Sequence, residues 1–107
     1  MTFKALFAAA LLVMMAPVAF ADHATTAQEA YQEAMDKMMK EMQKPMSGDA
    51  DKDYAMMMIS HHQGAIDMSE AELKYGKNET LRAMAQKVID AQTKEIKELK
   101  DWQAAHP

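Results

Sequence analysis

The feature that most restricts the fold is the spacing of apolar residues, which recur every three or four positions in three segments and nowhere alternate as in a strand. The first segment begins at Thr26, whose side chain fits a capping box with that of Glu29, and Pro45 ends it. This pattern predicts an amphipathic helix and then a turn. The apolar face of that helix consists of Tyr31, Met35, Met38 and Met42.

A second, longer helix is predicted over residues 51–75. Three aspartates, Asp49, Asp51 and Asp53, give its start a negative charge that suits the positive end of the helix dipole. Gly76 is expected to end it in a left-handed conformation. Its apolar surface forms two stripes, which is typical of a central helix with a neighbour on each side. One stripe is Ala55, Ile59, His62, Ile66 and Leu73, and the other is Met57, His61, Gly64 and Met68.

The third helix is predicted from the N-cap Asn78 to about Gln103. Its single core stripe comprises Leu81, Met84, Ala85, Val88, Ile89, Ile96, Leu99 and Trp102. Because the connections between the segments are short, neighbouring helices should run antiparallel. The predicted fold is therefore all-α, a small antiparallel bundle of three long helices. So small a core favours a homodimer, in which a second copy completes a larger bundle.

Residues 1–21 have the pattern of a secretory signal peptide. Lys4 supplies the positive start, an apolar run follows, and residues 19–21 (Ala-Phe-Ala) form a small-x-small cleavage site. The apolar run is shorter than a membrane span, so we expect no stable membrane anchor after cleavage. Residues 22–107 would then form one exported domain, either periplasmic or secreted.

Composition argues against several classes of function. The chain has no cysteine, which excludes disulfides, thiolate zinc sites and cysteine nucleophiles. Three glycines leave no room for a phosphate-binding loop, and a formal charge of −4 speaks against a nucleic-acid partner. The Glu-x-x-His pairs of a di-iron bundle are absent, and no acid/base pair or nucleophile is evident. We therefore expect that the protein is not an enzyme.

Methionine is the unusual residue of this chain, with thirteen copies. Three belong to the predicted signal peptide, and eight of the others fall between residues 35 and 58: Met35, Met38, Met39, Met42, Met46, Met56, Met57 and Met58. The third helix has an equally long apolar stripe but only Met84. If methionine served only as a flexible core filler, the third helix should share it. The uneven distribution indicates a role beyond packing.

His61 and His62 lie in this methionine-rich region. Adjacent helical residues point about 100° apart, so each histidine has its own neighbours. His61 lies between Met57 and Met68, and His62 has Met58 one turn before it. At a spacing of four residues, a thioether and an imidazole can reach the same point. Thioether sulfur is a soft ligand that selects Cu(I), and Ag(I) by the same argument, whereas it adds little for zinc.

The expected location of the metal follows from the stripes. The first helix offers three thioethers, Met35, Met38 and Met42, which suit the stripe that carries His61. The third helix offers mainly aliphatic residues, which suit the stripe that carries His62. The soft ligands are therefore expected to gather between the first and second helices, with the third helix as support.

Residues 58–68, with the sequence MISHHQGAIDM, resemble the CopM-like family of secreted, Met/His-rich proteins with a ferritin-like helical domain. The resemblance extends over residues 53–102. It implies periplasmic copper binding and copper tolerance, as a chaperone or buffer, with other periplasmic copper-handling proteins as partners. The ligands that it implies are Met57 or Met58, His61, His62 and Met68. Leu99 departs from the family, because methionine often precedes the tryptophan there.

An interaction protein is the alternative reading. Methionine adapts to irregular partners, so an exported Met-rich helical surface would suit a holdase that binds unfolded clients without any metal. This alternative accounts for Met39 and Met56, which lie off the main apolar stripes, but it gives no reason for the two adjacent histidines.

Overall fold

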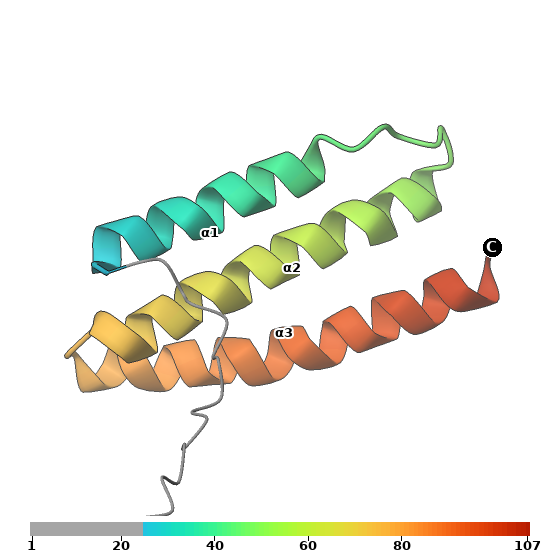
Figure 1. Cartoon of the computed structure of the whole chain (residues 1–107). Coiled ribbons are helices and arrows are strands. Elements are labelled where there is room, and N and C mark those ends of the chain that lie inside the picture. The colour runs from blue at the N-terminus through green and yellow to red at the C-terminus, as the bar shows by residue number, and fades with distance from the viewer. Residues whose placement is uncertain (1–24) are drawn as a thin grey trace, which may run out of the picture.

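The computed structural model describes residues 25–107, which form three α-helices and no strand. These are α1 (Ala27–Met42), α2 (Ala50–Tyr75) and α3 (Glu79–Ala105), and Figure 1 shows them running antiparallel in succession. The predicted all-α antiparallel bundle is confirmed. The predicted signal peptide lies outside the described residues. Within residues 25–107, no helix is long and apolar enough to cross a membrane.

Local hydrogen bonds explain where the helices begin. Thr26 accepts a bond from the backbone N–H of Glu29, whose carboxylate bonds back to the N-cap, so the predicted capping box is confirmed. The carboxylate of Asp49 caps α2 by accepting bonds from two backbone N–H groups. Asn78 caps α3, as predicted, by accepting a bond from the N–H of Leu81.

The end of α2 differs from the prediction. Gly76 has a φ of −72°, so no left-handed residue terminates the helix. Instead, the guanidinium of Arg82 in α3 donates hydrogen bonds to the carbonyl oxygens of Leu73 and Gly76, at 2.5 and 3.1 Å. A charged side chain thus satisfies carbonyl groups that a left-handed cap would otherwise satisfy through the backbone.

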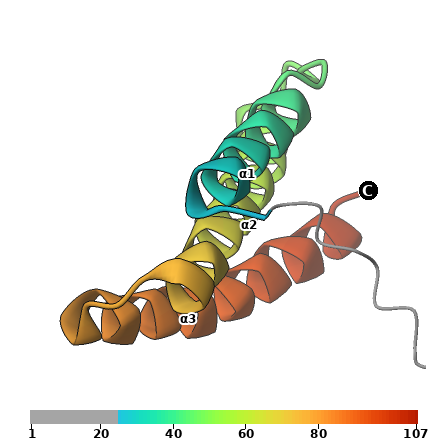
Figure 2. The same ribbon diagram turned by 60° about the vertical axis from the view of Figure 1, so that its left-hand side comes forward.

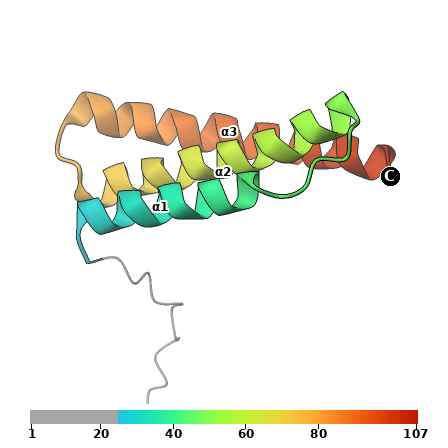
Figure 3. The ribbon, with the colours of Figure 1, turned by 90° about the horizontal axis from the view of Figure 1, so that it is seen from above.

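The three helices form a single layer with α2 in the middle. Helix α2 packs against both α1 and α3, as its two apolar stripes predict, and among residues 25–107 the two outer helices pack only against α2. Figure 2 shows α1 and α3 on opposite sides of α2, and Figure 3 shows the same order from above. Side chains on opposite sides of α2 therefore meet different neighbours.

The core is made mostly of small residues. The buried apolar side chains are Ala34, Ala55, Ile66, Ala71, Ala85 and Ile96. Burying one isoleucine stabilises a fold by about 1.5–3 kcal/mol, and only two are available here. Leu81 and Met84, which were predicted to lie on the core stripe of α3, are 52% and 56% exposed. Both line an open groove formed by α2 and α3, with Tyr31 of α1 at its edge.

Candidate metal centre

Met38 of α1 lies directly against the backbone of α2 at Gly64. A Cβ atom at position 64 would lie 2.6 Å from the Met38 sulfur and 3.0 Å from its Cγ. Only glycine leaves room for this thioether. Gly64 is three residues after His61 and four before Met68, so it shares one face of α2 with both. The structure thus places a sulfur donor of α1 on the α2 stripe that carries His61.

Two contacts join α1 and α2 on the side of this sulfur toward the start of α1 and the end of α2. The hydroxyl of Tyr31 donates a hydrogen bond to Glu72 at 3.1 Å, and Lys37 lies 3.7 Å from the carboxylate of Asp67. Burial, and then the bond to Glu72, raises the pKa of the Tyr31 hydroxyl. This hydrogen bond and ion pair favour one register of α1 on α2, the register in which Met38 lies opposite Gly64.

The loop between α1 and α2 is held by Asp53. Its carboxylate accepts hydrogen bonds from the N–H and hydroxyl of Ser47, at 2.7 and 2.9 Å, and from the N–H of Gly48 at 3.1 Å. The bond from the Ser47 backbone is the largest of the influences that lower the pKa of this carboxyl. Gly48 has a φ of +86°, a conformation that glycine tolerates without strain. This tight loop also fixes the register of α1.

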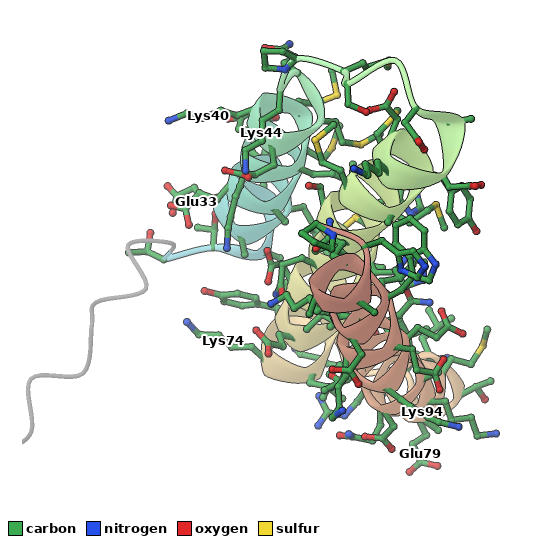
Figure 4. The ribbon with its side chains drawn as sticks, turned by 90° about the vertical axis from the view of Figure 1, so that its right-hand side faces the viewer. Glu33, Lys40, Lys44, Lys74, Glu79 and Lys94 are labelled. Atoms are coloured by element: carbon green, nitrogen blue, oxygen red, sulfur yellow. The ribbon has the colours of Figure 1, made fainter. Side chains whose placement is uncertain are left out.

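The other candidate ligands on this side are more open. His61 is exposed, and its ring meets that of His62 edge-on, with centroids 6.3 Å apart. Met42, Met57 and Met68 are partly buried, whereas Met35 is 49% exposed. Figure 4 shows several sulfur atoms between the α1 and α2 ribbons, toward the connecting loop. The α1–α2 side thus presents accessible thioethers together with one accessible imidazole.

His62 lies on the other side of α2. It is only 7% exposed, and its Nε2 is 2.6 Å from a carboxylate oxygen of Glu95 in α3. It lines a cavity of about 500 Å³ between α2 and α3, together with Met58 of the preceding turn. Tyr54, Leu99 and Trp102 supply apolar walls to this cavity, and Glu95 and Glu98 supply carboxylates.

The two adjacent histidines therefore have different surroundings. His61 is exposed and shares a face of α2 with Met57 and Met68 by helical spacing, and Met68 also lines a groove with Met84 of α3. His62 is buried and shares a cavity with Met58 against α3. Within residues 25–107, no three His, Asp or Glu side chains form a group that could hold a metal ion. The donors that accompany each histidine at helical spacing are thioethers.

Sequence reasoning did not single out Glu95. The available signal was its position on the border of the apolar stripe of α3, where a carboxylate can reach a polar atom on the neighbouring helix. Its pairing with His62 depends on the axial register of α3 relative to α2. The spacing of apolar residues within each helix does not determine that register.

Comparison with known proteins gives a family. The chain matches the family described as Domain of unknown function (DUF305) over residues 9–103. No curated protein matches it. The match covers most of the sequence, including all of α1 and α2 and most of α3. The chain therefore belongs to the DUF305 family.

Proposed function

We propose that this protein is exported to the periplasm, binds Cu(I) through methionine and histidine, and sequesters or passes on the ion to give copper tolerance. The observation that carries the proposal is the position of the methionines. None of those in residues 25–107 belongs to the buried core, and Met35, Met39 and Met46 are 49–64% exposed. Filling a core does not account for sulfur atoms at the surface.

Ligand chemistry supports copper over other metals. Soft thioethers favour Cu(I), and Ag(I) as its analogue, while imidazole also suits copper. Methionine forms no disulfides, so it remains usable as a soft ligand in an oxidising compartment where thiols are lost. The CopM-like resemblance of residues 58–68 supports the same conclusion, and other periplasmic copper-handling proteins are the partners that it implies.

The proposed ligands form two groups. Those on the α1–α2 side are Met38, Met57, His61 and Met68, with Met35 and Met42 beside them. Those on the α2–α3 side are Met58 and His62. The first group includes the exposed His61, which suits capture and exchange of an ion, whereas His62 of the second group is buried.

A competition titration tests the proposal. Purified protein comprising residues 22–107 is titrated with Cu(I) against a chelator, and in parallel with Zn(II). We expect Cu(I) to bind far more tightly than Zn(II), and the double variant His61→Ala, His62→Ala to lose affinity while it keeps its helix content. Met84→Leu is the control for methionine content: Met84 lines a groove with Met68 that contains neither histidine. Equal affinities for the two metals, or normal copper binding by the double variant, would refute the proposal.

A holdase for unfolded proteins is the second candidate. The observation that favours it is a set of large apolar side chains at the surface, including Met35, Tyr54, Leu81 and Met84, each about half exposed or more. The predicted homodimer would use such a surface too, and the size of the protein in solution tests it. A holdase should suppress aggregation of an unfolded client in the presence of a copper chelator, and the double histidine variant should do so equally well.

A further inference from the structure

His62 is held by one ring nitrogen and has no partner at the other. Its Nε2 is 2.6 Å from a carboxylate oxygen of Glu95, while its Nδ1 is buried with no hydrogen-bond partner among the described residues. The side chain of Glu95 is 49% exposed, so the carboxylate remains solvated on its outer side. A buried polar atom without a partner is rare in folded proteins and calls for an explanation.

The contact with Glu95 selects one tautomer of the imidazole. A carboxylate oxygen accepts hydrogen bonds, so at 2.6 Å the Nε2 atom must carry the proton. The opposite tautomer would place a nitrogen lone pair against a negatively charged oxygen, and would leave a buried Nδ1–H without an acceptor. Neutral His62 therefore keeps its free lone pair on Nδ1.

This is the arrangement that metal-binding histidines commonly have, in which one ring nitrogen donates to a carboxylate and the other binds the ion. We propose that Glu95 is a positioning residue that directs Nδ1 of His62 to a second Cu(I) site between α2 and α3, with Met58 as the thioether ligand. The inference rests on the proposed function and divides it into two sites, one on each side of α2.

The cavity around His62 suits an ion bound by soft ligands. Met58 precedes His62 by one helical turn and lines the same cavity, so its sulfur and the imidazole can converge on one point. Leu99 and Trp102 give this cavity apolar walls, while the exposed side chains of Tyr54 and Glu95 leave it open to solvent. His61 offers an internal contrast, because it is exposed and has no carboxylate partner among the described residues.

The test uses two substitutions of Glu95 in the background His61→Ala, His106→Ala, in which His62 is the only histidine left among residues 25–107. His106 is removed because its ring stacks on Trp102, a wall of the same cavity. Glu95→Gln keeps an oxygen that accepts the Nε2–H bond, whereas Glu95→Leu removes it. We expect Glu95→Leu to weaken Cu(I) binding about 10- to 100-fold, the range found when such supporting carboxylates are lost. Glu95→Gln should keep most of the affinity. Glu98→Leu, which alters the same cavity without touching His62, is the matched control and should bind as the background variant does.

A second readout does not depend on copper. Nitrogen NMR of the metal-free protein reports which ring nitrogen of His62 carries the proton. We expect the Nε2–H tautomer in the parent and in Glu95→Gln, and a mixture in Glu95→Leu. Circular dichroism confirms that each variant stays helical.

Two results would overturn the inference while the proposed function stands. One is a parent protein in which the proton resides on Nδ1 of His62. The other is unchanged Cu(I) affinity in Glu95→Leu. A parent protein that binds no Cu(I) at all is a different failure: it refutes the proposed function and the metal role of the His62 site together.

Discussion

The substitution Gly64→Ala tests the contact that places Met38 on α2. The added methyl group would lie 2.6 Å from the Met38 sulfur and 3.1 Å from its Cβ. The sulfur can move by rotation of the side chain, but the Cβ moves only with the backbone of α1. We therefore expect α1 to shift by a few tenths of an ångström, which moves the Met38 thioether away from His61.

The expected energies come from two opposing effects. Overpacking of this kind destabilises a protein by about 1–3 kcal/mol, whereas replacing glycine by alanine inside a helix stabilises it by about 1 kcal/mol. The free energy of unfolding should therefore change little or fall by up to about 2 kcal/mol. In the background Met38→Ala the contacts with the sulfur and Cγ are gone and only the 3.1 Å contact with Cβ remains. The same substitution should then stabilise the protein by up to about 1 kcal/mol.

A double-mutant cycle measures this difference. Denaturant unfolding of the parent, both single variants and the double variant should give a coupling energy of about 1–3 kcal/mol. Cu(I) affinity should fall in Gly64→Ala even where stability is unchanged. If Gly64→Ala stabilises the parent as much as the Met38→Ala background, Met38 does not pack on Gly64, and the argument for a sulfur ligand from α1 fails.

Three further predictions concern the ligands and the loop. Replacing Met35, Met38 and Met42 with Leu, a nearly volume-conserving change, should keep the helix content but weaken Cu(I) binding in a competition titration. Met84→Leu should change neither the helix content nor the Cu(I) affinity. Lowering the pH should weaken Cu(I) binding, because protons compete for imidazole, and affinity should then level off where thioethers alone bind; pH-independent affinity would exclude histidine ligands. The hydrogen bonds in the loop lower the pKa of Asp53. Asp53 therefore stabilises the fold at pH values above the ordinary pKa of an aspartate carboxyl. This stabilisation is lost as the pH falls through the lowered pKa of the folded protein. Asp53→Asn should therefore make the free energy of unfolding depend less on pH in the acidic range, as measured by denaturant unfolding at several pH values.

The helices could be predicted because their signals are local. The Thr26 capping box, the Asn78 cap and the central position of α2 are each determined by residues within a few turns, and the structure confirms all three. The predicted left-handed end at Gly76 was wrong because the interaction that replaces it is not local: Arg82 reaches back from α3 to the last carbonyl groups of α2.

The remaining details depend on register between helices, which one sequence does not determine. The stripes indicate that the two histidines face different sides of α2, but they do not indicate that Glu95 meets His62 or that Met38 meets Gly64. A shift of one helical turn in either packing would pair other residues and keep the same stripes. Leu81 and Met84 illustrate the same limit, because their spacing is right for a core and yet no helix covers them.

The layered arrangement explains how adjacent histidines can have different properties. In a closed bundle both sides of a central helix would face one shared interior, but here α1 and α3 each cover one side of α2. His61 is exposed at the surface of α2, whereas His62 is buried against α3 and bonded to a carboxylate. The protein environment tunes an imidazole through burial and through the partner of its second nitrogen. One dipeptide on a central helix therefore supplies one accessible imidazole and one oriented imidazole, which under the proposed function would serve exchange and retention of the ion respectively.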